Sequence, residues 1–86
     1  MAIVTVRYWA AAKHAAGVAE ESVSASTLSE LLAAVEVRHR PAPDLKAVIG
    51  RSSFLVDGEQ TSGRAPDAVA LRDGAVVEIL PPFAGG

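Results

Sequence analysis

Alternating apolar and polar positions near both ends of the chain predict two β-strands, over residues 3–9 and 75–80. In the first segment one face is uniformly apolar and the other is mixed, so the apolar face should point into a core. The last segment divides between two faces in the same way. The expected core positions are Val4, Val6, Tyr8, Ala75, Val77 and Ile79, and the opposite positions are Ile3, Thr5, Arg7, Trp9, Val76, Glu78 and Leu80.

Helical signals lie between these strands. Residues 10–16 are rich in alanine and stop at Gly17, which is typical of a short helix with a glycine C-cap. Thr27 and Glu30 match a capping box, and apolar residues at 28, 31, 32 and 35 follow at helical spacing. We therefore expect one main helix that begins after Thr27 and ends at Pro41.

Shorter elements complete the pattern. Residues 20–24 suit a short edge strand, and residues 45–49 carry apolar positions that indicate one helical turn. A strand over residues 54–56 leads into Asp57-Gly58, a strong hairpin-turn signal, and a return strand should begin at Glu59. The order strand, strand, helix and then two or three strands predicts an α+β chain with a sheet covered by the helix on one face.

This is the order of a β-grasp (ubiquitin-like) fold, here a mixed sheet of four to five strands with one main helix packed across it. We expect residues 1–80 to form that domain and residues 81–86 to form a flexible C-terminal Gly-Gly tail. In a β-grasp sheet the first and last strands are central neighbours. Trp9 and Leu80 should then project together from the face opposite the helix, with Ile3 and Val76 around them, as an apolar docking surface for a partner. Arg7 on that face could contact an acidic group of the partner or be solvated.

The composition excludes several classes of function and does not point directly to one. The 86 residues fit one domain, contain no cysteine and carry a formal net charge of -2 without a basic patch, so we expect no thiolate metal site and no nucleic-acid binding. With no bilayer-length apolar run and no leader pattern, we expect no membrane contact and a cytoplasmic location. We interpret His14, His39 and the pair Glu20-Glu21 as solvated surface residues. Ser52-Ser53 lacks the nearby base that a nucleophile needs. We expect no self-sufficient active site, and we also expect no bound metal.

The chemistry that remains lies in the ending Pro81-Pro82-Phe83-Ala84-Gly85-Gly86. The two prolines cannot donate ladder hydrogen bonds and should end the last strand. Six extended residues reach roughly 20 Å, and a terminal glycine pair can enter a channel too narrow for a β-carbon. ATP could activate the carboxylate of Gly86 as an acyl-adenylate, which a sulfur donor would convert to a thiocarboxylate. A frayed end is the plainer interpretation of two terminal glycines, and the preceding strand and prolines favour the functional one.

Over essentially its whole length the chain resembles the small subunit of molybdopterin synthase, within the ubiquitin-like sulfur carriers of the MoaD/ThiS kind. The resemblance rests on the opening strand, the alanine-rich segment, the capped helix, both Asp-Gly turns and above all the ending. These markers are Val4–Trp9, the segment ending at Gly17, the Thr27 helix, Val56–Gly58, Leu71–Gly74 and Leu80–Gly86.

The resemblance implies that an E1-like enzyme uses ATP to adenylate Gly86 and that a sulfur donor system then forms the thiocarboxylate. The tail, with Gly85 and Gly86 as its functional end and Pro81 to Ala84 lining the channel, would enter the large synthase subunit within a heterotetramer. There it would give sulfur to cyclic pyranopterin monophosphate. At the position of Trp9 the family often has Phe, so this chain has a bulkier side chain there. No bound cofactor is implied.

Three alternatives remain open. The chain could carry sulfur for another pathway, such as cysteine, thiamine or tRNA thiolation. It could be a ubiquitin-like modifier joined to lysines through Gly86. It could also be an interaction domain with an inert end.

Overall fold

The computed structural model describes residues 2–39 and 43–82. Its five strands form one mixed sheet in the order β2-β1-β5-β3-β4. The central strands β1 (Ala2–Tyr8) and β5 (Val76–Leu80) are parallel, and the other neighbours are antiparallel: β2 (Glu20–Ala25), β3 (Ser53–Val56) and β4 (Glu59–Gln60). This is the β-grasp architecture, with the first and last strands side by side in the centre as the sequence predicts.

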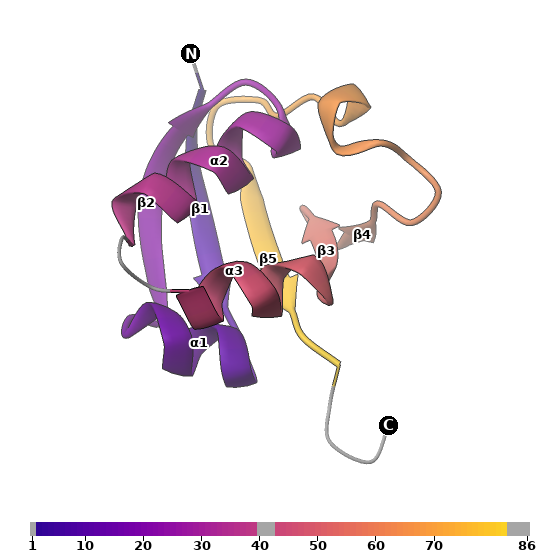
Figure 1. Ribbon diagram of the computed structural model, residues 1–86. Helices are drawn as coiled ribbons and strands as arrows, with labels where there is room; N and C mark the ends of the chain where they lie inside the picture. The colour runs from indigo at the N-terminus through magenta and orange to yellow at the C-terminus, as the bar shows by residue number, and fades with distance from the viewer. Residues whose placement is uncertain (1, 40–42, 83–86) are drawn as a thin grey trace.

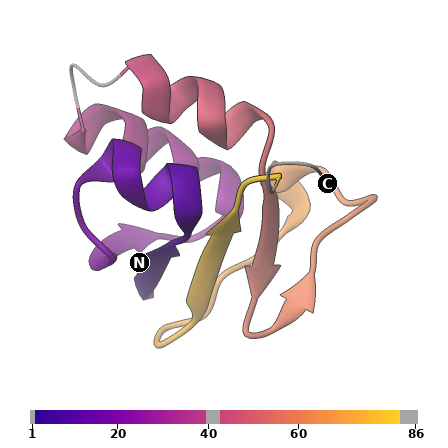
Figure 2. The ribbon, with the colours of Figure 1, turned by 90° about the horizontal axis from the view of Figure 1, so that it is seen from below.

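The helices cover one face of this sheet (Figures 1 and 2). They are α1 (Ala10–Ala16), α2 (Leu28–Arg38) and α3 (Pro43–Gly50), with a 3-10 turn η1 (Pro66–Ala68) in the long connection before β5. None of the helices in the described part of the chain is both long and apolar enough to cross a bilayer.

The core lies between the helices and the inward-facing strand positions. All six core positions expected on the two central strands are at most 2% exposed. Leu28, Leu31 and Val35 of α2 are at most 1% exposed and pack onto them. The alternation of period two therefore predicted the correct face of both strands.

Helix α2 begins as expected, with a small change in its cap. The Thr27 hydroxyl accepts a hydrogen bond from the Glu30 backbone N–H at 3.2 Å. Glu30 Oε1 in turn accepts from the N–H of Ser26, one residue before the N-cap, rather than from Thr27 itself. The helix ends at Arg38 with His39 as C-cap, and Pro41, which was expected to end it, lies outside the described residues.

Helix α3 is longer than the single turn expected from the sequence. It has eight residues, and its buried side chains Leu45, Val48 and Ile49 are at most 7% exposed. Helices α1 and α3 lie next to one another, so α3 extends the helical layer beyond α2 (Figure 1). The Asp57-Gly58 hairpin turn is confirmed, since both residues have positive φ, at 51° and 85°, as a type I′ turn requires.

Candidate functional site

The candidate site is the face of the sheet that the described helices leave uncovered, which we call the outer face. Paired strand positions point to the same side, so the register fixes its members. Trp9, which directly follows β1, also belongs to the outer face because its indole bonds to Glu78. The strand positions of this face are Ile3, Thr5, Arg7, Val76, Glu78 and Leu80 on β1 and β5, Ser53 and Leu55 on β3, and Glu20, Ser22 and Ser24 on β2.

Trp9 and Leu80 lie at the same end of the outer face. The backbone N–H of Trp9 donates to the carbonyl of Ile79 at 3.3 Å, which places the Trp9 backbone beside the last residues of β5. Trp9 is 40% exposed, whereas Leu80 is half-buried. The two side chains therefore project on the side predicted from the sequence, and their role as partner contacts stays a prediction.

The sequence predicts one apolar patch around Trp9, but in the structure the apolar residues of the outer face are not continuous. Ile3 is 53% exposed but lies six residues along β1 from Trp9, roughly 20 Å at strand spacing. Arg7 and Glu78, which are paired in register on the two central strands, separate Val76 from the Trp9 end. The face thus has two apolar ends with a charged pair between them.

Arg7, Trp9 and Glu78 form a connected group, which we call the outer-face triad. The indole Nε1–H of Trp9 donates to Glu78 Oε1 at 3.1 Å, and the guanidinium carbon of Arg7 lies 5.3 Å from the Trp9 ring centroid. Arg7 Nη1 is 4.0 Å from Glu78 Oε1. The sequence placed Arg7 and Trp9 among the candidate residues but missed Glu78. Glu78 could have been found by pairing β1 with β5 in parallel, because that pairing puts it opposite Arg7.

The root of the predicted tail lies directly beyond this triad. Strand β5 ends at Leu80, as the two prolines predict. Pro81 is still buried in the domain and Pro82 is exposed, so the chain leaves the fold between these two residues. The other predicted tail residues, Phe83, Ala84, Gly85 and Gly86, lie outside the described residues.

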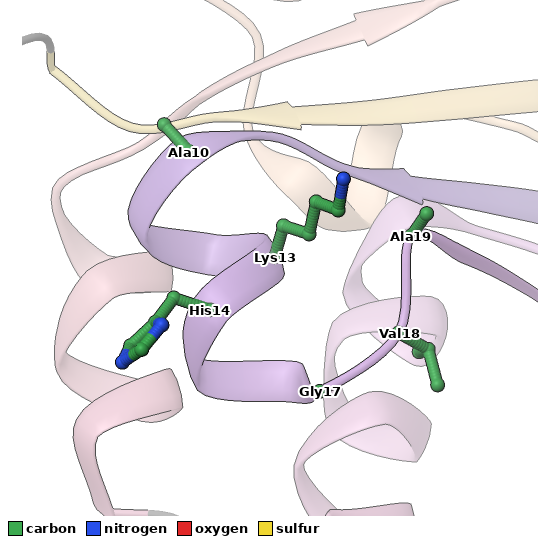
Figure 3. Close-up of a pocket in the computed structure, with 6 residues that line it drawn as sticks. All are labelled: Ala10, Lys13, His14, Gly17, Val18 and Ala19. Atoms are coloured by element: carbon green, nitrogen blue, oxygen red, sulfur yellow. The ribbon is translucent and has the colours of Figure 1, made fainter.

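A hollow of about 400 Å³ lies beside α1, close to the same end of the sheet (Figure 3). Among the described residues, its ionisable lining side chains are those of Lys13 and His14, which point to different sides of the helix (Figure 3). Alanine, glycine and valine supply the remaining lining. Because these two side chains point apart, they do not act as a pair on one bound group.

A second polar cluster lies on the helix side of the sheet. Two of its residues were interpreted wrongly from the sequence. Glu21 and His39 were expected to be solvated, but each side chain is only 15% exposed. Glu21 accepts hydrogen bonds from the Tyr8 hydroxyl and from His39 Nε2, the latter at 2.5 Å. Arg38 donates to the Ser22 carbonyl at 2.6 Å and pairs with Glu21 at 3.4 Å.

The pKa values in this cluster follow from its contacts. Burial alone would raise the pKa of Glu21, but hydrogen bonds from Tyr8, His39 and Arg38 and the charge of His39 together hold it below the ordinary value. Burial raises the pKa of Tyr8 far above its ordinary value, and Glu21 adds to this. We interpret the cluster as a structural link between α2 and strands β1 and β2. Within residues 2–39 and 43–82, no three acidic or imidazole side chains gather as a metal site would require.

Comparison with known proteins gives consistent matches. Residues 6–86 match the model of the ThiS family. None of the curated protein sequences matches the chain significantly. Among solved structures, small archaeal modifier protein 1 (SAMP1) from Methanosarcina acetivorans has a TM-score of 0.83 and 27% identity, covering 100% of this chain and 98% of its own.

Two similar chains come from protein–protein complexes. One is the complex of subunits 1 and 2 of the molybdopterin-converting factor from Helicobacter pylori, with TM-score 0.68, 25% identity and coverage of 98% of this chain and 99% of that one. The other is the BexX/CysO complex of Amycolatopsis orientalis, with TM-score 0.75, 25% identity and coverage of 96% and 99%. These similarities span the whole domain.

Proposed function

Because this chain belongs to the ThiS family, we propose that it is a sulfur carrier whose working group is the C-terminal carboxylate of Gly86. The observation that carries the proposal is that the family match runs through residue 86 and so includes the Gly85-Gly86 ending. The β-grasp fold, which this chain has in common with the solved structures, supports the same proposal. Strand β5 supports it further, since it leads the chain out of the domain beside Trp9 on the outer face.

The proposed chemistry requires partners, because adenylation needs an enzyme that binds ATP and the working group of this chain is its C-terminal carboxylate. An E1-like enzyme would use ATP to join AMP to the Gly86 carboxylate and release pyrophosphate. A sulfur donor would then displace AMP and leave one sulfur atom in place of one carboxylate oxygen. Activation therefore takes place in another protein, and this chain supplies only the acyl group.

The outer face is the surface on which we expect such partners to bind. Six extended residues span roughly 20 Å at most, so a partner holding Gly86 must approach within that distance of Leu80. Trp9, Leu80, Arg7 and Val76 are the contacts expected there, with Pro81, Pro82, Phe83, Ala84 and Gly85 in the partner's channel. Trp9 is the side chain of most interest, since exposed tryptophan contributes strongly to binding energy when a partner covers it.

For the pathway, we propose the small subunit of molybdopterin synthase. The similarity to a chain of the Helicobacter pylori molybdopterin-converting factor complex supports this assignment. The partner would be the large synthase subunit in a heterotetramer, where the thiocarboxylate delivers sulfur to cyclic pyranopterin monophosphate in the cytoplasm. The similarity to CysO leaves a second sulfur pathway open.

A protein modifier is a second candidate function, favoured by the similarity to SAMP1. The same activated Gly86 would then form an isopeptide bond with a lysine amine in place of a thiocarboxylate. The two functions share the adenylation step and differ only in the nucleophile that follows it.

Intact-mass measurement separates these functions. The chain is incubated with the E1-like enzyme of its own organism, ATP and a sulfur donor. A sulfur carrier gains the mass of one sulfur atom minus one oxygen atom, whereas a modifier gives a ladder of conjugates. The chain lacking Gly86 should gain nothing while melting at the wild-type temperature. An unchanged wild-type mass, or the same gain without Gly86, refutes the proposal.

Sulfur transfer to the pterin precursor then tests the pathway. The thiocarboxylated chain is mixed with the large synthase subunit, and dithiolene formation is followed. Leu80→Asp should weaken binding of the large subunit at least tenfold, because an unpaired carboxylate would be buried at the interface. No transfer by the wild-type chain rejects this pathway and leaves the general carrier function to the mass experiment.

A further inference from the structure

The contacts within the outer-face triad restrict the orientation of the Trp9 side chain. Trp9 is the sole tryptophan of the chain and lies on its surface. An exposed indole would ordinarily sample several orientations, since nothing packs around it. Here one edge of the ring is fixed by the hydrogen bond from Nε1 to Glu78, and one face lies against the Arg7 guanidinium.

The backbone of Trp9 is fixed as well. Its N–H donates to Ile79 in β5, and its carbonyl accepts from the N–H groups of Ala12 and Lys13 at the start of α1. The base of the side chain is therefore held between the end of β5 and the first turn of α1. With Arg7 and Glu78 acting on the ring itself, both backbone and side chain are restrained before any partner arrives.

The indole N–H and the Glu78 carboxylate of the triad satisfy one another. Glu78 points to the uncovered face, yet its side chain is only 19% exposed, and it contacts both Trp9 and Arg7. A partner that covers the triad would bury the Glu78 carboxylate already bonded to the indole N–H, with Arg7 close by. That arrangement avoids most of the cost of burying an unpaired charge within an interface.

We propose that Arg7 and Glu78 are positioning residues, which hold the indole of Trp9 in the orientation that the E1-like activating enzyme binds. The inference rests on the proposed function and specifies its docking step. The occupant is a folded protein with an apolar surface for Trp9 and Leu80, because the same protein must hold the tail that leaves the domain beside them. Orientation before binding increases affinity, since less side-chain freedom is lost in the complex.

Two measurements on the same variants test this inference. The first is time-resolved anisotropy of the single tryptophan, which reports how freely the indole moves without any partner. Glu78→Ala and Arg7→Ala should each add a fast component of local motion. Glu78→Gln should add little, because its amide oxygen still accepts from the indole. Glu59→Ala, which removes an exposed carboxylate from edge strand β4, is the control and should match the wild type.

The second measurement is ATP–pyrophosphate exchange by the organism's E1-like enzyme, with the chain as varied substrate. Glu78→Ala should raise the KM for the chain about 3- to 10-fold at unchanged kcat, as expected when one side chain must be immobilised on binding. Glu78→Gln should stay within about twofold of the wild type on the same reasoning. A change in stability alone would not move KM while sparing kcat.

The outcomes separate the inference from the proposed function. Failure of the wild-type chain to support exchange overturns the proposed function, and the inference with it. Exchange by the wild-type chain with an unchanged KM for Glu78→Ala overturns the inference alone. Unchanged anisotropy in both alanine variants also overturns it, because the triad would then not hold the indole.

Discussion

Ala10 carries the sharpest stability prediction in the structure. It is the first residue of α1 and has φ of +49°, whereas the preceding Trp9 is extended. The left-handed region costs an L-residue roughly 1–2 kcal/mol, because its β-carbon approaches the following carbonyl oxygen. Glycine has no such penalty but loses about 0.5–1 kcal/mol more chain entropy on folding. Ala10 is exposed, so removing its methyl group leaves no cavity in the core. Ala10→Gly should therefore stabilise the fold by about 0.5–1 kcal/mol.

Ala11 provides a matched control one residue further along. It is also exposed and belongs to the same helix, but it is not among the residues with positive φ. Ala11→Gly should destabilise the fold by about 0.5–1 kcal/mol, since glycine only adds entropy there. The same substitution at adjacent positions should thus shift stability in opposite directions. The two midpoints should differ by about 4–16 °C in a domain of this size.

Thermal unfolding followed by circular dichroism, together with urea titration, measures both variants. Equal m-values would show that the substitutions act on stability and not on the surface exposed by unfolding. If Ala10→Gly lowers the midpoint as Ala11→Gly does, Ala10 is not strained. The turn from β1 into α1 would then have a different backbone conformation.

Two further substitutions test the helix α2 and the polar cluster at its end. Thr27→Ala should cost about 1 kcal/mol through loss of the N-cap, measured by urea unfolding, while Ser29→Ala on the exposed side of the same helix should cost nothing. Glu21→Gln should cost about 1–2 kcal/mol at neutral pH, because Tyr8 and His39, which both bond to Glu21 Oε2, lose a charged acceptor. The lowered pKa of Glu21 means that its contribution is complete above the ordinary carboxyl pKa of 4.5 and is lost as pH falls through the folded value. Wild-type stability should therefore decline more steeply than that of Glu21→Gln over this acid range, and parallel curves would contradict the assignment.

Much of the fold was predictable because local patterns and burial agree. The alternation in β1 and β5 named every buried residue of the two central strands except Ala2, which precedes the predicted strand. The capping box placed the start of α2 correctly. Helix α3 was underestimated because it is short, begins at a proline and ends at Gly50, so local signals for a helix were weak. Its stability comes from burying Leu45, Val48 and Ile49, a tertiary effect that sequence periodicity shows only faintly.

The polar clusters were harder to predict for a different reason. Glu21 and His39 are 18 residues apart and meet only because α2 packs across β2 with a particular offset. Glu78 likewise reaches Trp9, 69 residues away, through the parallel register of β1 and β5. Neither strand's own pattern encodes that register. The sequence could therefore assign side chains to faces, but it could not say which of them meet on a face.

The position of β5 also bears on how a partner could hold the end of this chain. Strand β5 is hydrogen-bonded on both sides, to β1 and to β3, up to the pairs Tyr8–Ile79 and Ser53–Leu80. A pull on an edge strand breaks one ladder, whereas a pull on β5 must break two, and Pro81 remains buried beyond the last pair. Under the proposed function, a partner that holds the tail would therefore pull on β5, the strand that is hydrogen-bonded on both sides. Arg7 and Glu78 of the outer-face triad lie on β1 and β5, and the backbone of Trp9 is bonded to Ile79 of β5. The docking residues and the root of the tail would therefore move as one rigid unit.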